Sequence, residues 1–275
     1  RSCLAQTFGD FELIVVVDGS TDGTVELLRQ CADPRLRVVE KENGGLPRAL
    51  NSGFENARGA FWTWTSDDNR YHPTALDVMV RHLEARPECP MVVCDHWLID
   101  EAGERVGRSR TAVACFLYRA AVARQTGAYR PELYLVEDTD FFLRLQHEGG
   151  AIQRVQTPLY DYRVHAESLS TRHIGRRQLV LARMKWDLFE RGVLSGEAHT
   201  LFEDPIRQAA RYGDEESLSA IIAFAAEKAG WRVAATLAVK ARVLMTRPGY
   251  VENRITLAAR ARWRELKAAL GSWSY

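Results

Sequence analysis

The sequence has 275 residues, of which 27% are charged and 46% hydrophobic, and its formal net charge is +1. These values are typical of a soluble globular chain with one large domain, or with a domain and an appendage. No run of about 18 apolar residues occurs, which excludes a membrane-spanning helix. The charge is unevenly distributed, because residues 1–171 carry 19 Lys and Arg against 25 Asp and Glu, whereas residues 172–275 carry 18 against 11.

The five cysteines form an odd set in which no two have C-x-x-C spacing. We expect reduced, buried, small apolar side chains in a cytoplasmic protein, because paired cysteines belong to oxidising compartments. The absence of an Asn-x-Ser/Thr sequence agrees with that location. These cysteines are Cys3, Cys31, Cys89, Cys94 and Cys115.

Short apolar runs alternate with helical patterns over residues 11–90. This alternation predicts an α/β fold with a mostly parallel sheet and helices on both faces. Such a sheet does not begin with the end of a helix, so we expect a first strand that this sequence lacks. The expected strands are 13–17, 36–39 and 61–65, and the expected helices are 25–31, 47–56 and 73–84.

The remaining pattern changes from mixed to helical near Thr171. We expect strands at 91–94, 152–155 and 160–164, a turn or hairpin at 100–111, a strand passing into a helix over 115–125, and a helix over 137–146. The later helices are expected at 179–189, 195–212, 215–229, 232–245 and 254–270.

Two adjacent carboxylates, Asp67 and Asp68, follow the aromatic strand that contains Trp62. The carboxyl end of a strand in an open α/β sheet is where ligands bind. Because the two carboxylates repel each other, a divalent cation such as Mg²⁺ or Mn²⁺ is one way to offset their charge. A solvated turn that ends the strand and caps the next helix is the alternative.

The loop after the first strand, Asp18–Thr24, is rich in glycine and oxygen side chains. A carboxylate there can accept hydrogen bonds from a ribose or a base, and glycines let the backbone approach a nucleotide. The Gly-Lys-Ser/Thr element of a P-loop is absent. A plain strand-to-helix turn with capping residues is the alternative.

Four segments together resemble family 2 glycosyltransferases, although each is weak alone. The resemblance covers about residues 1–170 and implies a GT-A fold, a nucleotide-sugar donor and inverting transfer. On this basis residues 1–172 form an N-terminally truncated GT-A domain, and residues 173–275 form a helical C-terminal region. The segments are Ala5–Thr24 (without Gly9, Asp10 and Val17), Trp64–Asn69, Glu137–Leu145 and Leu159–His165.

The resemblance also assigns roles to single residues. Asp138 is the expected general base, with Glu137 orienting the acceptor or the base, since a positioned carboxylate can accept the hydroxyl proton. The expected metal ligands are Asp67, Asp68 and His165, and the expected nucleotide-binding residues are Asp18, Gly19, Ser20, Asp22 and Asp67. Arg163 and Arg144 are candidates for phosphate or acceptor binding.

Two positions depart from the family pattern: Val17 and Thr65 stand where the family usually has aspartate. Asp67 is therefore expected to carry most of the metal binding.

Simpler roles remain open for several of these residues. The acids at the start of the 137–146 helix would also be stabilised there by the helix dipole. A salt bridge between Arg144 and Asp140 is an alternative to phosphate binding. Tyr129 and Tyr134 are candidates for stacking on a sugar ring.

The C-terminal segment is basic, with eight Lys and Arg against two acids over residues 240–267. A basic amphipathic helix can lie on an anionic membrane, and a solvated helix packed on the catalytic domain is the alternative.

We therefore expect a cytoplasmic glycosyltransferase that moves a sugar, most simply from a UDP-sugar, to a hydroxyl of a glycan, lipid or small metabolite. Divalent metal is the expected cofactor, peripheral membrane contact through the C-terminal helices is an open alternative, and no nucleic acid partner is expected. Two other functions remain: a sugar-1-phosphate nucleotidyltransferase, and an inactive carbohydrate-binding or nucleotide-binding relative.

Overall fold

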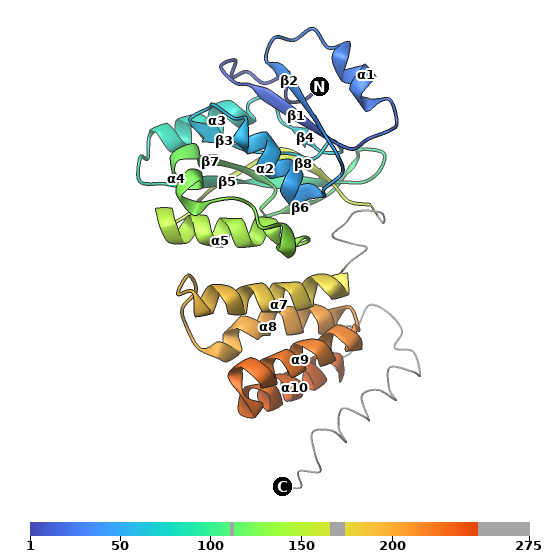
Figure 1. Ribbon diagram of the computed structural model, residues 1–275, viewed down its shortest axis with the longest axis vertical. Coiled ribbons are helices and arrows are strands. Elements are labelled where there is room, and N and C mark those ends of the chain that lie inside the picture. Colours follow the sequence, from blue (N-terminus) through green and yellow to red (C-terminus); the bar gives the residue numbers. More distant parts are fainter. Residues whose placement is uncertain (111–112, 166–173, 247–275) are drawn as a thin grey trace. The chain divides into compact units, whose positions relative to one another are not determined.

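The structure is a computed structural model that describes residues 1–110, 113–165 and 174–246. It divides into two compact units, Arg1–Ser168 and Leu169–Tyr275 (Figure 1). The first unit contains all the described strands, and the described part of the second is helical. The helix expected over 254–270 lies outside the described residues.

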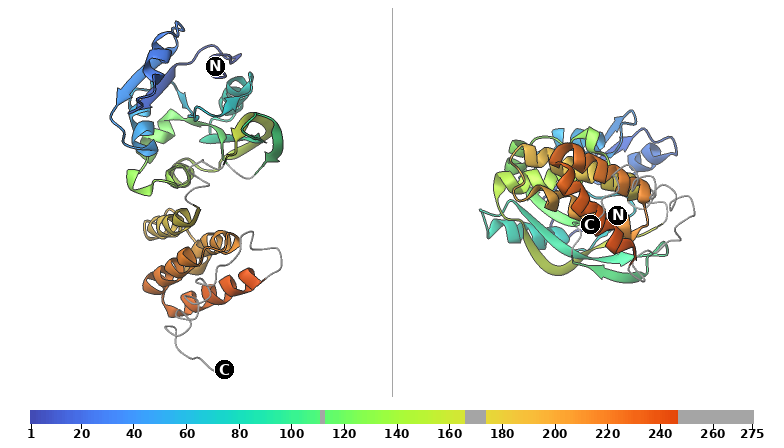
Figure 2. Two further views of the ribbon diagram at one scale, coloured as in Figure 1. Left: turned by 90° about the vertical axis from the view of Figure 1, so that its right-hand side faces the viewer. Right: turned by 90° about the horizontal axis from the view of Figure 1, so that it is seen from below.

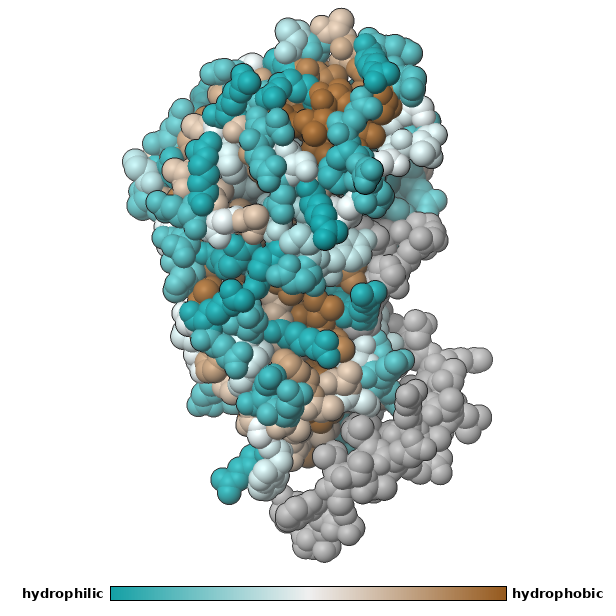
Figure 3. Space-filling view, viewed as in Figure 1, coloured by the Kyte–Doolittle hydropathy of each residue, from teal (hydrophilic) through white to brown (hydrophobic). Residues whose placement is uncertain are grey.

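The first unit begins with a small parallel sheet. β1 (Leu13–Asp18) and β2 (Leu36–Lys41) are joined by α1 (Thr24–Arg29), and α2 (Leu46–Glu55) follows. Among the described residues, β1 pairs with β2 alone. Most of its side chains are only half-buried, and apolar surface is visible in this region in Figure 3. The further strand expected beside this pair stays a prediction.

The second sheet has six strands and mixed direction. Its order is β3-β7-β5-β8-β4, with β6 on β5, and β5 with β8 is its parallel pair. The α/β class is confirmed, but the sheet is not mostly parallel, because strands enter it as hairpins as well as crossovers. The strands are β3 (Phe61–Trp62), β4 (Arg70–Tyr71), β5 (Met91–Ile99), β6 (Arg105–Ser109), β7 (Cys115–Arg119) and β8 (Gln153–Arg163).

Helices cover both faces of this sheet because the side chains of β5 point alternately to either side. Val92 and Cys94 pack with α3 (Ala75–Glu84), and Met91 and Val93 pack with α5 (Glu137–Gly149). Between β7 and α5 lie α4 (Ala120–Thr126) and the 3₁₀ turn η1 (Pro131–Leu133).

Three sequence expectations are corrected by the structure. The aromatic strand ends at Trp62 rather than at residue 65, and beyond it Thr63 bonds to β7 through its side-chain hydroxyl. The two strands expected at 152–155 and 160–164 form the single strand β8, because shifts of register beside Asp95 accommodate Pro158. Cys31 is exposed just after α1, whereas Cys89, Cys94 and Cys115 are buried as expected.

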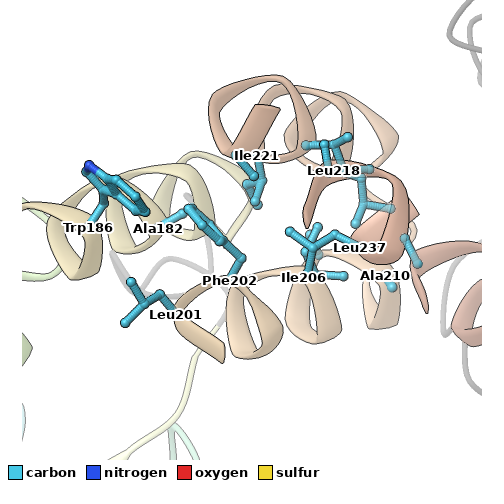
Figure 4. Close-up of a cluster of buried hydrophobic side chains, with 14 residues drawn as sticks. Ala182, Trp186, Leu201, Phe202, Ile206, Ala210, Leu218, Ile221 and Leu237 are labelled. Atoms are coloured by element: carbon cyan, nitrogen blue, oxygen red, sulfur yellow. The ribbon is translucent and has the colours of Figure 1, made fainter. Parts of the chain in front are cut away.

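The helical unit contains α7 (Ile174–Glu190), α8 (Ala198–Arg211), α9 (Glu215–Ala229) and α10 (Trp231–Thr246). Its core includes Trp186, Phe202, Ile206, Ile221 and Leu237 (Figure 4). Both α7 and α10 pack on α8 and α9, and they lie on opposite sides of that pair (Figure 2). None of the described helices is long and apolar enough to cross a membrane.

Candidate functional site

Asp18 ends β1 and lies beside the turn that starts α2. Its Oδ1 accepts hydrogen bonds from Lys41 Nζ at 2.6 Å and from the Gly44 amide at 2.9 Å, and its Oδ2 accepts from the Gly45 amide at 2.8 Å. Burial alone would raise the pKa of the Asp18 carboxyl, but these hydrogen bonds outweigh it and lower that pKa. Asp18 therefore carries a negative charge and fixes the two glycines at the start of α2.

The role of Lys41 as the partner of Asp18 was not predicted from the sequence, although the sequence contains a signal for it. Asp18 and Lys41 are paired residues at the carboxyl ends of two parallel strands. Opposite charges at such positions meet, because neighbouring parallel strands end at the same edge.

The loop after Asp18 combines a close approach with a helix cap. Gly19 has φ of +78°, and a Cβ there would lie 2.7 Å from the Asn43 nitrogen, so a side chain does not fit. Ser20 is exposed. Asp22 Oδ1 accepts hydrogen bonds from Thr24 Oγ1 at 2.6 Å and from the Thr24 amide at 3.2 Å. Asp22 therefore stabilises the start of α1, as a plain strand-to-helix turn requires. Its binding of a nucleotide stays a prediction.

The two adjacent carboxylates of the metal motif differ in their surroundings. Asp67 is exposed, whereas Asp68 is partly buried and its Oδ2 lies 3.4 Å from His165 Nε2. Asp68 Oδ1 is buried and has no hydrogen-bond partner within the described part of the chain. A buried, unpartnered carboxylate oxygen beside an imidazole fits a divalent cation that takes its other ligands from phosphate oxygens.

The side chains near Asp68 would not complete a metal centre by themselves. No cluster of three or more His, Cys, Asp and Glu side chains suited to a metal occurs among residues 1–110, 113–165 and 174–246. This arrangement is consistent with an ion shared with a substrate, since Mg²⁺ is usually held by one or two carboxylates plus phosphates.

Hydroxyl groups hold the segment that leads to the carboxylates. Thr63 Oγ1 donates to the Phe116 carbonyl at 2.6 Å and lies 2.9 Å from the Tyr71 hydroxyl. Thr65 Oγ1 lies 2.6 Å from the hydroxyl of Tyr160, a buried residue whose pKa burial raises. The threonine at the position where the family often has aspartate is thus anchored to β8.

Arg163 connects the same turn to the β5–β6 hairpin. Its Nε donates to the Asp68 carbonyl at 3.1 Å, and its Nη1 donates to the carbonyls of Asp100 and Glu101 at 2.6 and 2.8 Å. Its amide donates to Asn69 Oδ1 at 2.8 Å. Arg163 thus holds the turn at Asp68 and Asn69 against the hairpin. Its binding of phosphate stays a prediction.

The two candidate catalytic carboxylates open α5. Glu137 is buried, and Asp138 Oδ1 accepts hydrogen bonds from the Thr139 amide at 2.6 Å and from its hydroxyl at 3.2 Å. Just before them, Leu135 has φ of +86°, a conformation that costs energy for a residue with a side chain. Such strain is common where a loop must present functional groups in one fixed geometry.

Asp140, two residues after Asp138, is fully buried between two arginines. Arg130 forms an ion pair with it, and Arg144 Nε donates to its Oδ2 at 2.9 Å. Arg144 also donates to the carbonyls of Thr126 and Ala128 at 2.6 and 2.9 Å. Arg144 therefore forms the salt bridge that the sequence offered as an alternative to phosphate binding.

Tyr129 connects α2, Trp64 and α5. Only 2% of it is exposed, so the prediction that it stacks on a sugar ring is wrong. Its ring stacks on Phe141 of α5 at 4.2 Å, and its hydroxyl accepts from Trp64 Nε1 at 3.1 Å. Asn51 of α2 donates to its carbonyl at 2.8 Å and accepts from its amide at 2.9 Å.

The charges of the two candidate catalytic carboxylates affect the pKa of Tyr129. Burial raises the pKa of its hydroxyl; the hydrogen bonds from Tyr118 and Trp64 oppose that rise, and the charges of Asp138 and Glu137 add to it. Tyr129 thus lies within electrostatic reach of the start of α5 while it contacts α2 and Trp64.

Comparison with known proteins agrees with this arrangement. Residues 1–138 match glycosyl transferase family 2. EpsH of Bacillus subtilis (strain 168), named as a glycosyltransferase, is 28% identical over 234 residues, which are 74% of this chain and 64% of EpsH. This chain therefore spans less than two thirds of that relative.

Two solved structures show similarity over nearly the whole chain. S. aureus TarS in complex with UDP is 18% identical, with a TM-score of 0.63 over 98% of this chain and 84% of that one. The mannosyltransferase PcManGT from Pyrobaculum calidifontis, in complex with GDP-Man and Mn²⁺, is 18% identical, with a TM-score of 0.57 over 97% and 78%. At these identities the similarity shows the fold.

The fold is that of the GT-A class. Within that class, the chain belongs to glycosyltransferase family 2, since the family match covers half of its length. The resemblance inferred from the four sequence segments is confirmed.

Proposed function

We propose that this chain transfers a sugar from a nucleoside diphosphate sugar, of the UDP-sugar class, to a hydroxyl of a glycan, lipid or small metabolite. The observation that carries the proposal is the unpartnered, buried oxygen of Asp68 beside His165 in a family 2 chain. The structural neighbours support the donor class, because TarS structures contain UDP and UDP-GlcNAc.

Asp68 and His165 would hold a divalent cation, together with oxygens of the donor diphosphate. PcManGT, whose structure contains Mn²⁺ and GDP-Man, supports this assignment. Such a cation offsets the negative charge that develops on the leaving phosphate. Arg163 keeps Asp68 in place through its backbone carbonyl, and the Thr65–Tyr160 contact fixes the approach of the chain.

Asp138 would act as general base in an inverting transfer. The acceptor oxygen attacks the anomeric carbon as the bond from that carbon to the phosphate oxygen breaks, and the electron pair leaves with the nucleoside diphosphate. The hydroxyl proton passes to the Asp138 carboxylate. Attack from the side opposite the leaving group inverts the configuration, and buried Glu137 would orient the acceptor or the base.

Donor binding tests this function directly. A panel of nucleotide sugars is added to the purified chain with Mn²⁺, and the unfolding temperature is measured. A donor at about 100 times its Kd stabilises the native state by about 2.7 kcal/mol, so the right nucleotide gives a clear rise. Failure of every nucleotide sugar to raise the unfolding temperature would refute the proposal.

The pair Asp68→Asn and Asp67→Asn tests the metal assignment. Both remove one carboxylate from the same turn, but only Asp68 lies beside His165. We expect Asp68→Asn to raise the Mn²⁺ concentration needed for half-maximal donor binding by far more than Asp67→Asn does. The opposite order would return the main metal role to Asp67, as the sequence suggested.

A further inference from the structure

An exposed apolar stripe runs along one side of α10. Trp231, Val239 and Val243 are 64%, 65% and 47% exposed, and they lie within about 120° of arc at 3.6 residues per turn. The opposite side of the helix packs into the bundle core, where Ala234, Leu237 and Ala241 are buried. One side of α10 is therefore buried in the bundle, and its outer side also carries large apolar side chains. The outer side of a surface helix is usually polar.

Positive charge is interleaved with this stripe. α10 contains three basic residues and no acidic residue. Lys240 is taken up by an ion pair inside the bundle, with its Nζ 2.6 Å from Glu203 Oε1 of α8. Arg232 and Arg242 lie among the exposed apolar side chains. An aromatic, aliphatic and cationic face of this kind matches the boundary between lipid headgroups and acyl chains.

The charges disfavour two other occupants. A second copy of the chain, packed on α10 about a twofold axis, would bring Arg232 and Arg242 of one copy close to the same two arginines of the other. The segment 247–275 holds six Lys and Arg against two acids, so its docking on α10 would bring positive charge onto positive charge. The same basic segment strengthens attraction to an anionic surface, where each Lys or Arg near the lipid contributes about 1 kcal/mol.

We propose that the outer face of α10 binds an anionic lipid surface, with Trp231, Val239 and Val243 entering the headgroup boundary and Arg232 and Arg242 contacting lipid phosphates. The contact is peripheral, because none of the described helices can cross a membrane. It is independent of glycosyl transfer, so its test needs no donor or acceptor.

The test is flotation of the purified full chain with vesicles of phosphatidylcholine alone, or of an equal mixture with phosphatidylglycerol. We expect binding to the mixed vesicles only, weakened by salt because the attraction is electrostatic. Val239→Gln with Val243→Gln should weaken binding at least about tenfold, and Arg232→Gln with Arg242→Gln should weaken it by a similar factor and reduce its salt dependence.

A matched control uses exposed apolar residues of the other unit. Leu27 is 69% exposed and Val106 is 62% exposed, so Leu27→Gln with Val106→Gln removes equivalent apolar surface elsewhere and should leave binding unchanged. Circular dichroism melts confirm that each variant is folded. Binding that survives Val239→Gln with Val243→Gln would overturn the role of α10, as would a full chain that never floats with the mixed vesicles. Light scattering tests the remaining alternative. If the chain is a dimer that the α10 substitutions dissociate, the partner of this face is a second copy of the chain and not lipid.

Discussion

Asn51 holds the loop before α5 against α2, and its removal should displace the proposed catalytic carboxylates at the start of α5. Asn51→Ala deletes both hydrogen bonds to the backbone of Tyr129 and leaves a buried amide and carbonyl without partners. At about 0.5–1.5 kcal/mol for each bond, we expect the free energy of unfolding to fall by about 1–3 kcal/mol. Because α5 follows this loop, kcat should also fall, by about tenfold or more.

Asn56 provides the matched control, since it lies at the end of the same helix and its side chain donates to the Ser52 carbonyl within that helix. Asn56→Ala should change stability by less than about 0.5 kcal/mol, as exposed positions usually do. Urea unfolding measures the global effect, and hydrogen exchange of the Tyr129 amide measures the local one. The reasoning is refuted if Asn51→Ala lowers the free energy of unfolding no more than Asn56→Ala does and both variants have the same kcat. Other contacts would then position the loop.

Two further predictions concern buried charges. Asp140→Asn leaves Arg130 and Arg144 without their shared carboxylate and should cost about 3–5 kcal/mol in urea unfolding, as loss of one partner in a buried ion pair does. A loss below about 1 kcal/mol would show that the pair is effectively solvated. The lowered pKa of Asp18 means that its ion pair with Lys41 stabilises the fold fully above the unfolded-state pKa of about 3.9, and that this stabilisation is lost as pH falls through the folded-state value. Asp18→Asn should therefore be less stable than wild type at neutral pH, with the difference shrinking in acid; a constant difference across that range would contradict the linkage.

The sequence located the helices and strands better than it located the partners of long side chains. Asp68 and His165 were both predicted as metal ligands, and they meet although they are 97 residues apart. The resemblance to family 2 placed both residues in one site, and their binding of a metal stays a prediction. Apolar periodicity likewise predicted the four described helices of the second unit, since each must bury one side.

Arginine and tyrosine partners were harder to predict. Arg163 and Arg144 looked like phosphate ligands, yet both donate to backbone carbonyls, which leave no trace in side-chain identity. Tyr129 lies in a polar loop, and its burial depends on the asparagine of a distant helix. The mixed direction of the larger sheet was missed for a similar reason: a buried antiparallel strand such as β7 has the same apolar run as a parallel one.

The most direct test of the proposed function is the transfer rate of Asp138→Asn with a UDP-sugar, Mn²⁺ and an acceptor. Glu148→Gln, an exposed change on the same helix, is the matched control. If Asp138 is the base, its variant should lose about 10²- to 10⁴-fold in kcat while donor affinity and the control's rate stay at wild-type values. Equal turnover by Asp138→Asn and wild type would contradict the account.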